Sequence, residues 1–257
     1  MRTLLLVVPL LLLASCDSAP DPVDSTTEIT VLVAYSASVA AASGDVDAII
    51  ARGFTETNAV YTESGVRARL VPVHTVQVDY EATDRLEALG ALMGTSDGVL
   101  DDLHALRDQY QADIVLLVTG PSGMTINGSV MATPENAFLL VQWEVLGAPG
   151  YGLAHEMGHL HGGRHNADED PLNVPFAYGH GFRTDAYRTV LSGGGQRKVP
   201  RFSGPDVTFE GTVMGNAEVH DVARVVQETA IYLSNFRGPQ TPTTFASPGT
   251  WPTIPAP

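Results

Sequence analysis

Several stretches of apolar side chains in the first part of the chain have the length of β-strands. Residues 29–35 form a nearly continuous apolar run, which is typical of a strand that is buried on both faces. Residues 68–80 alternate in part and are rich in valine, which favours strands. Three further stretches of this kind predict strands at residues 113–119, 127–133 and 138–143.

Other segments repeat their apolar residues every three to four positions, which is the spacing of an amphipathic helix. Within residues 45–64, Val46, Ile50 and Phe54 recur at this spacing. The same pattern predicts helices at residues 96–110, 150–161 and 217–236. Strands that alternate with helices predict an α/β fold, in which helices back a twisted, mixed and largely parallel sheet. Between the last two helices the pattern is irregular, so we expect an irregular C-terminal subdomain that ends in a helix.

The two ends of the chain differ in composition from the part between them. Residues 1–15 have a basic residue, Arg2, near their start and continue with an apolar run that is too short to span a bilayer, which predicts a signal peptide for export. Residues 16–28 and 238–257 are rich in Pro, Ser and Thr. We expect the first to be a flexible tether and the second a disordered tail. Residues 29–237 are then predicted to form one domain.

Cys16 is the only cysteine in the chain and ends the sequence Leu-Ala-Ser-Cys. This sequence resembles the lipobox of bacterial lipoproteins. The resemblance implies that Cys16 carries lipid. The protein would then belong to the cell envelope and contact the membrane through this lipid anchor alone. The alternative is an ordinary signal peptide cut near Ala14, which would give a secreted protein. With one cysteine, no disulfide can form within a monomer.

The charge of the chain excludes several kinds of partner. It has 29 acidic residues against 14 basic ones, and its formal net charge is −15. Nucleic acids and anionic lipid surfaces require dense positive charge, so we expect the protein to bind neither. A large net charge also opposes self-association, and we therefore expect a monomer.

Residues 155–165 match the pattern HExxHxxGxxH at every fixed position. His155 and His159 are four residues apart, so on a helix they share one face and can hold one zinc ion. Gly162 can adopt the left-handed conformation that ends a helix, which would return His165 as a third ligand. Catalytic zinc sites have three protein ligands and one open position for water, and this spacing therefore predicts such a site.

Glu156 follows the first histidine, where its carboxylate can reach a water molecule at the metal. We predict that Glu156 is the general base of a hydrolase that acts on proteins or peptides, with zinc as its cofactor. Three alternatives stay open: a non-catalytic zinc site, an envelope lipoprotein that binds a ligand without catalysis, and a zinc hydrolase of a non-peptide bond. The glutamate together with three ligands argues against the first two, and the third histidine argues more weakly against the last.

The extended zinc motif is the hallmark of the metzincins. The sequence around it resembles the peptidyl-Asp metallopeptidases, which are secreted bacterial enzymes of that clan. The matching stretches cover most of the predicted domain and comprise residues 29–35, 58–61, 64–65, 69–73, 112–117, 154–165, 177–179, 202–205 and 223–237. The resemblance implies a metzincin-type fold and a zinc endopeptidase that cleaves before aspartate.

The chain departs from the pattern of this family in two respects. Metzincins carry a methionine in a tight turn under the metal, and residues 188–191 place Leu191 at that position. Leucine and methionine have similar volumes and their exchange usually costs less than about 1.5 kcal/mol, so we expect Leu191 to form the floor of the site. Met214 is the alternative. The second departure is that the disulfide cysteines of the family are lacking.

A basic segment follows the zinc motif. Five of the 14 bases lie within nineteen residues, namely Arg183, Arg188, Arg197, Lys198 and Arg201. In metzincins, the region after the third histidine forms the wall of the pocket beyond the scissile bond, and a base there would pair with a substrate carboxylate. We therefore predict that Arg188, Lys198 and Arg201 bind substrate, with Arg188 as the first choice. The alternative is a solvated surface cluster. The substrate backbone is expected to pair with the predicted strand at residues 127–133.

Overall fold

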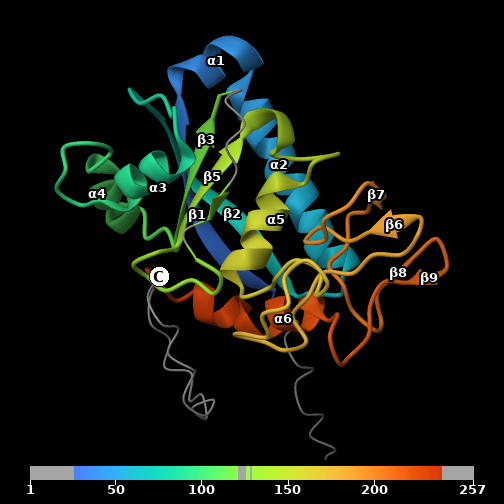
Figure 1. Cartoon of the computed structure of the whole chain (residues 1–257). Helices are drawn as coiled ribbons and strands as arrows, with labels where there is room; N and C mark the ends of the chain where they lie inside the picture. Colours follow the sequence, from blue (N-terminus) through green and yellow to red (C-terminus); the bar gives the residue numbers. More distant parts are fainter. Residues whose placement is uncertain (1–25, 121–125, 128, 239–257) are drawn as a thin grey trace, which may run out of the picture.

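The structure is a computed structural model that describes residues 26–120, 126–127 and 129–238 (Figure 1). The predicted signal peptide, residues 16–25 of the predicted tether with the lipidation site Cys16, and residues 239–257 of the predicted tail lie outside the described residues. The first strand begins at Thr27, two residues before the predicted start of the domain. No helix in the described ranges is both long enough and apolar enough to cross a lipid bilayer.

A five-stranded sheet forms the centre of the described part of the chain. Its strands are β1 (Thr27–Ser36), β2 (Ala68–Val78), β3 (Ile114–Thr119), β4 (Ile126–Asn127) and β5 (Phe138–Gln142). They are arranged in the order β2-β1-β3-β5-β4. The first four strands in this order are parallel, whereas β4 runs antiparallel to β5 at the edge. The predicted mixed, largely parallel sheet is therefore confirmed.

Strand β1 is apolar along most of its length because both of its faces are covered. Val31 and Val33 belong to the larger core cluster, on one face of the sheet. Leu32 and Ala34 belong to the second cluster, on the opposite face. All four side chains are fully buried. Successive side chains of a strand point to opposite faces, so a strand that is covered on both sides needs apolar residues at every position.

Six α-helices of the described residues pack around this sheet (Figure 1). They are α1 (Ala37–Ser43), α2 (Val46–Glu63), α3 (Arg85–Met93), α4 (Asp102–Gln109), α5 (Gly152–Leu160) and α6 (Val222–Leu233). Helices α2, α5 and α6 supply Phe54, Met157 and Val226 to the larger cluster. Helices α3 and α4 supply Leu92 and Leu103 to the second cluster. The sheet is thus enclosed between two layers of helices, as the alternation of elements predicts.

The chain between α5 and α6 is largely irregular, which confirms the predicted C-terminal subdomain. Its regular parts are a short 2-stranded pair β6 (Tyr187–Arg188) and β7 (Arg197–Lys198), and a second pair β8 (Thr208–Phe209) and β9 (Thr212–Val213). Strands β6 and β7 are parallel, with Arg188 opposite Lys198. This strand pair therefore places two bases of the basic segment, Arg188 and Lys198, side by side.

The predicted strand at residues 127–133 is wrong in its extent. Of the described residues in this region, only Ile126–Asn127 pairs with β5 as a strand, and residues 129–133 do not. Further on, Met131 N donates to His159 O at 2.9 Å and Ala132 N donates to Leu160 O at 2.8 Å. The backbone of this segment thus satisfies the last carbonyl groups of α5, which a helix leaves without partners. Apolar composition alone did not distinguish docking on a helix end from pairing in a sheet.

The predicted helix at residues 96–110 is also shorter than expected, because α4 covers only Asp102–Gln109. A helix that the pattern did not indicate, α3, precedes it. The side chain of Asp84 caps α3 by accepting hydrogen bonds from Leu86 N at 2.9 Å and Glu87 N at 3.0 Å. Such a capping aspartate is a sequence signal for a helix start, and it could have located α3.

Candidate metal centre

Helix α5 carries the first two histidines of the motif on one face. The rings of His155 and His159 lie one turn apart, with their centroids separated by 4.8 Å. Every residue of α5 except His155 is buried. Packing on all sides therefore fixes the position of the helix, and with it the positions of both rings.

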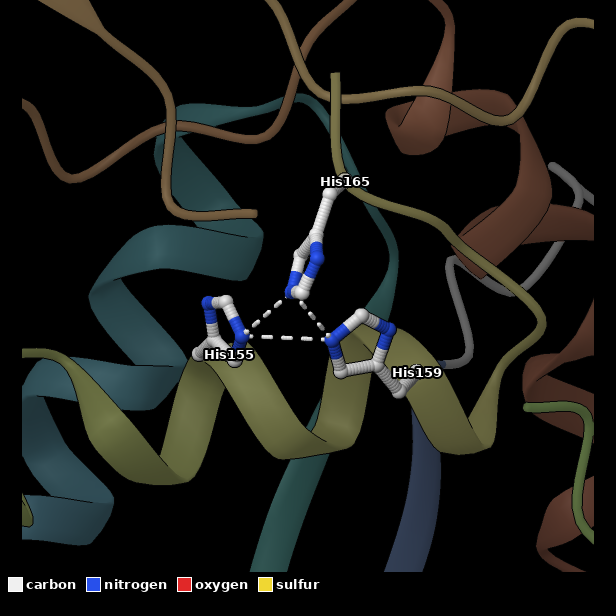
Figure 2. A group of neighbouring side chains, drawn as sticks. All are labelled: His155, His159 and His165. Carbon is white, nitrogen blue, oxygen red and sulfur yellow. Dashed lines mark hydrogen bonds between the residues drawn. The ribbon is translucent and has the colours of Figure 1, made fainter. Parts of the chain in front are cut away.

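The end of α5 turns the chain back toward these rings. Gly162 N donates to His159 O at 2.8 Å, and the φ angle of Gly162 is 106°, in the region that favours glycine. A Cβ atom on Gly162 would lie 2.8 Å from Cε2 of Phe176, which leaves no room for a side chain. The reversed chain then places His165 opposite the two histidines of the helix (Figure 2).

The three imidazoles meet through their Nε2 atoms (Figure 2). The distance from His159 Nε2 is 3.1 Å to both His155 Nε2 and His165 Nε2, and 3.3 Å separate the other two atoms. Nitrogen ligands at about 2.0–2.1 Å from a tetrahedral zinc ion are roughly 3.3–3.4 Å apart. The three histidines are therefore positioned to bind one metal ion, and the spacing suits zinc.

The hydrogen bonds of the rings show which nitrogen atoms can bind a cation. His155 Nδ1 lies 2.9 Å from Val190 O, and His159 Nδ1 lies 2.8 Å from Gly163 O. A carbonyl oxygen only accepts, so Nδ1 donates in both rings and Nε2 of each neutral ring carries a lone pair. Lone pairs at this distance repel each other unless a cation lies between them. The donor set therefore fits a metal ion.

The pKa values of the three rings favour the neutral form that binds metals. Burial, followed by the charge of His159, lowers the pKa of His155 well below its ordinary value. Burial, followed by the charge of His165, lowers the pKa of His159 to about 4. Burial also lowers the pKa of His165. Metal ions compete with protons for the same lone pairs, so these shifts favour metal binding at neutral pH.

Glu156 is the neighbour of the first histidine on α5, and only 5% of its surface is exposed. Burial lowers the pKa of Lys198 in the basic segment to about 8, and the negative charge of Glu156 acts against this shift, so the two side chains interact electrostatically. A buried carboxylate beside a candidate metal site is a typical general base.

Residues 25–189 match the family model described as Metallo-peptidase family M12. The chain belongs to this family. It is 32% identical over 222 residues to the peptidyl-Asp metalloendopeptidase of Stenotrophomonas maltophilia (strain K279a), covering 80% of this chain and 52% of the relative. It is also 32% identical over 213 residues to the enzyme of that name from Xanthomonas campestris pv. campestris, covering 80% and 51%. The chain thus spans about half the length of the curated relatives it matches.

The fold of this M12 chain also occurs in a solved structure titled "Structure of a chaperone-substrate complex". The TM-score is 0.66 at 19% sequence identity, and the match covers 84% of this chain and 36% of the other. At this level of identity the likeness shows the fold alone.

Leu191 lies against α5 in this M12 chain, at the position predicted for the floor of the site. It is fully buried. A Cβ atom on Gly158 would lie 3.0 Å from Cδ1 of Leu191, and one on Gly163 would lie 2.6 Å from the same atom. Met214 directly follows β9, where its backbone N–H donates to Val207 O at 2.8 Å, and its side chain is also buried in the larger core cluster. Leu191 therefore packs against the helix that carries the histidines.

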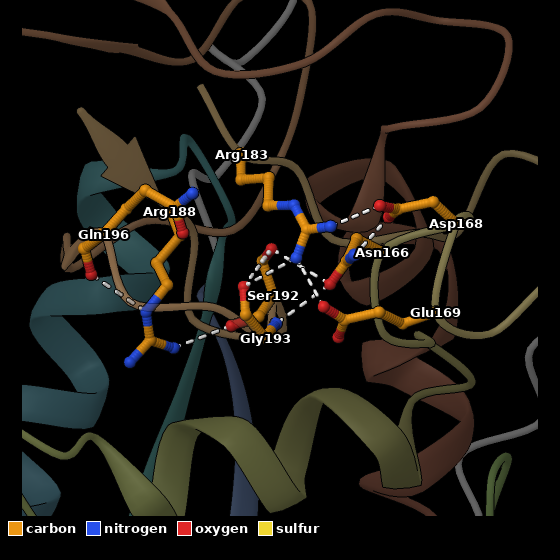
Figure 3. A network of polar contacts seen from close by, with 8 residues as sticks. All are labelled: Asn166, Asp168, Glu169, Arg183, Arg188, Ser192, Gly193 and Gln196. Carbon is orange, nitrogen blue, oxygen red and sulfur yellow. Dashed lines mark hydrogen bonds and ion pairs between the residues drawn. The ribbon is translucent and has the colours of Figure 1, made fainter. Parts of the chain in front are cut away.

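Asn166 connects the third histidine to the turn that contains Leu191 (Figure 3). It follows His165 in the chain and is 2% exposed. Its Oδ1 accepts hydrogen bonds from Gly193 N at 2.9 Å and from Ser192 Oγ at 3.2 Å. Next to it, Arg183 forms ion pairs that tie the segment after His165 to the basic segment; its partners are Asp168 and Glu169 (Figure 3).

The pattern of the sequence does not single out Asn166. Its contacts with Ser192 and Gly193 join residues that are 26 and 27 positions apart, which no local periodicity reports. The one available signal is its place directly after the third histidine. The pattern also leaves His180 without a role, yet its Nδ1 lies 2.9 Å from His165 O and supports the same loop.

Arg188, the first choice for substrate binding, is engaged within its own loop (Figure 3). Its Nε donates to Gln196 O at 3.0 Å and its Nη1 donates to Ser192 O at 2.7 Å. These bonds hold the loop between β6 and β7 in shape. Two of the three guanidinium nitrogen atoms of Arg188 are thus engaged with carbonyl groups of this loop.

The other two predicted substrate-binding bases differ from each other. Arg201 forms an ion pair with Glu63 at the end of α2. Lys198 is partly buried, and its Nζ donates to Gly150 O at 2.9 Å, just before α5 begins. Of the three predicted bases, Lys198 is thus the one whose side chain lies at the N-terminal end of the helix that carries Glu156.

His161, the fourth histidine of the motif region, points away from the metal face, as its position on the helix predicts. It is fully buried. Its Nε2 lies 3.0 Å from Tyr61 Oη and its Nδ1 lies 2.7 Å from Thr229 Oγ1. Burial lowers its pKa to about 3. His161 therefore links α5 to α2 and α6 as a neutral ring.

Proposed function

We propose that this chain is a zinc-dependent endopeptidase in which His155, His159 and His165 hold the metal ion and Glu156 is the general base. The observation that carries the proposal is the convergence of three Nε2 atoms at 3.1–3.3 Å beside a buried glutamate. Membership of the M12 metallopeptidase family supports the same activity. The names of the two relatives, peptidyl-Asp metalloendopeptidase, also support it.

A zinc ion, when bound, supplies Lewis acidity that polarises the scissile carbonyl and lowers the pKa of a water molecule to about 7. Glu156 takes a proton from the attacking water and returns it to the amine that leaves. Val190 O and Gly163 O keep the rings of His155 and His159 in the tautomer that presents Nε2 to the metal. The burial of α5 keeps these groups in place during the reaction.

The substrate is a protein or peptide that binds in an extended conformation. We place it along β4, because this strand is the edge of the sheet that contacts α5. An edge strand has unpaired backbone groups that can pair with an extended peptide. The described part of β4 comprises only Ile126–Asn127, so this edge is shorter than the sequence predicted.

We further propose that cleavage is favoured before acidic residues. The printed names of the relatives support this preference, and so does the basic segment that follows the zinc motif. The overall charge of −15 would repel an acidic peptide, so a local positive group has to overcome this field.

The proposal for the cellular location rests on the sequence. Cys16, at the end of a lipobox-like sequence, supports a lipid-anchored protein of the cell envelope, and cleavage near Ala14 would give a secreted form instead. Both forms are exported, as the apolar run in residues 1–15 predicts.

Hydrolysis of denatured casein tests the endopeptidase activity. The wild-type protein with zinc should cleave casein, and a chelator should abolish cleavage, which added zinc should restore. Glu156→Ala should keep its zinc and lose activity, whereas the exposed Glu218→Ala should retain activity as the matched control. A Glu156→Ala protein that cleaves casein at the wild-type rate would refute the role of Glu156. A zinc-loaded wild-type protein that leaves casein intact would refute the proposed endopeptidase function.

A further inference from the structure

Lys198 differs from the other bases of the basic segment in its contacts. Three of these bases form ion pairs: Arg183 with Asp168 and Glu169, Arg197 with Glu210, and Arg201 with Glu63. The guanidinium of Arg188 donates to two backbone carbonyls. Across residues 26–120, 126–127 and 129–238, no carboxylate forms an ion pair with Lys198. Its Nζ makes one hydrogen bond, to Gly150 O, and therefore keeps donor hydrogens for a ligand.

The ammonium of Lys198 lies at the N-terminal end of α5. Its hydrogen bond to Gly150 O, at 2.9 Å, fixes the side chain two residues before the helix begins. An ammonium has three donor hydrogens, so this bond leaves two of them for another acceptor. The N-terminus of a helix carries a partial positive charge, which adds to the attraction for an anion at this place.

The charge of Lys198 acts on the groups that would carry out hydrolysis. Its ammonium is close enough to Glu156 for the two charges to interact, and the carboxylate opposes the lowering of the Lys198 pKa by burial. Burial, followed by the charge of Arg188, lowers the pKa of Lys198 to about 8, so the ammonium is largely protonated at pH 7. The charge of Glu156 offsets only part of the cost of burying this cation, and an anionic group from a ligand would offset more of it.

We propose that Lys198 is the specificity-determining residue of the site, and that its ammonium pairs with the side-chain carboxylate of the substrate residue that follows the scissile bond. This inference rests on the proposed endopeptidase function. Arg188 positions the loop that leads to Lys198. Its hydrogen bonds to Ser192 O and Gln196 O hold the segment between β6 and β7 in shape. Neither Arg188 nor Arg201 contacts the substrate carboxylate.

Paired peptides test this assignment. They are blocked at both ends, so that no terminal carboxylate is present, and differ only in Asp, Asn or Lys after the cleaved bond. The kcat/KM ratio of the Asp peptide to the Asn peptide should fall about 10-fold or more in Lys198→Met, because a charge-assisted hydrogen bond is lost. Lys198→Arg should keep the preference for Asp, and Lys198→Glu should prefer the Lys peptide.

Two controls separate recognition from general damage. Arg197→Met removes the exposed neighbouring base of β7 and should keep the wild-type ratio of Asp to Asn. Arg188→Met should slow the cleavage of both peptides and preserve their ratio. Because each ratio is measured within one protein sample, partial misfolding of a variant does not change it.

The inference is overturned if Lys198→Met retains the wild-type preference, or if Arg188→Met abolishes the preference while Lys198→Met does not. A wild type that cleaves casein but treats the Asp and Asn peptides equally overturns the inference and leaves the endopeptidase function intact. Absence of any chelator-sensitive cleavage of casein overturns the function, and the role of Lys198 with it.

Discussion

Replacement of Gly162 by alanine should destabilise the protein through two separate effects. The φ angle of 106° is one that residues with a Cβ atom rarely adopt, which costs about 1–3 kcal/mol. The added Cβ would also lie 2.8 Å from Cε2 of Phe176 and 3.0 Å from Cγ of Pro175. Overpacking of this kind costs about 1–3 kcal/mol more. The free energy of unfolding should therefore fall by about 2–6 kcal/mol.

Two other glycines allow these effects to be measured apart. Gly65 has a φ of 74°, and no atom lies within 4 Å of the position that a Cβ would take there. Gly65→Ala should therefore show only the backbone cost, about 1–2 kcal/mol. Gly90 lies inside α3 with open space around it, and Gly90→Ala should stabilise the protein by about 0.4–1 kcal/mol. The expected order of stability is Gly90→Ala, wild type, Gly65→Ala and then Gly162→Ala.

Urea unfolding of the metal-free proteins, followed by circular dichroism, gives the free energies, and thermal unfolding should agree at roughly 2–4 °C per kcal/mol. Competition with a chelator should also show weaker zinc binding in Gly162→Ala alone, because the strained turn leads directly to His165. A Phe176→Ala background should reduce the cost of Gly162→Ala, since it removes the nearest ring atoms. If Gly162→Ala costs no more than Gly65→Ala, the reasoning from close packing is refuted.

Three further changes test other parts of the molecule. Asn166→Ala should weaken zinc binding roughly 10–100-fold, because it removes the support between His165 and the turn below the metal; unchanged affinity in a chelator competition would contradict this. The pKa of His161 is about 3 in the folded protein and about 6.5 when unfolded. The unfolded chain therefore binds a proton that the folded one does not, and stability should fall as the pH drops from about 6.5 toward 3. Urea unfolding at pH 7 and pH 5 should show a smaller loss in His161→Asn than in wild type, and equal losses would argue against this role. Cys16→Ser should abolish partitioning into the detergent phase, because two or more acyl chains anchor firmly; a wild-type protein found only in the aqueous phase would exclude the lipid anchor.

The amino-acid sequence by itself determined the features of this protein that depend on neighbouring residues. Continuous and alternating apolar runs located β1, β2, β3 and β5, and helical spacing located α2, α5 and α6. The zinc motif is of the same kind, because a spacing of four on a helix places His155 and His159 on one face whatever surrounds it. Gly162 marked the turn to His165 for a local reason as well, namely its positive φ.

Only the tertiary structure decided which partners meet across the fold. Residues 129–133 are apolar enough for a strand, yet part of their backbone docks on the end of α5. Asn166 accepts a hydrogen bond from Ser192, 26 residues further along the chain. Arg188 donates to Ser192 O in its own loop, whereas Lys198 donates to Gly150 O before α5, and this difference separates the two bases. The physical reason is that periodicity reports the burial of one face of an element. The partner of a polar side chain depends instead on how distant loops are placed, and local sequence does not specify that placement.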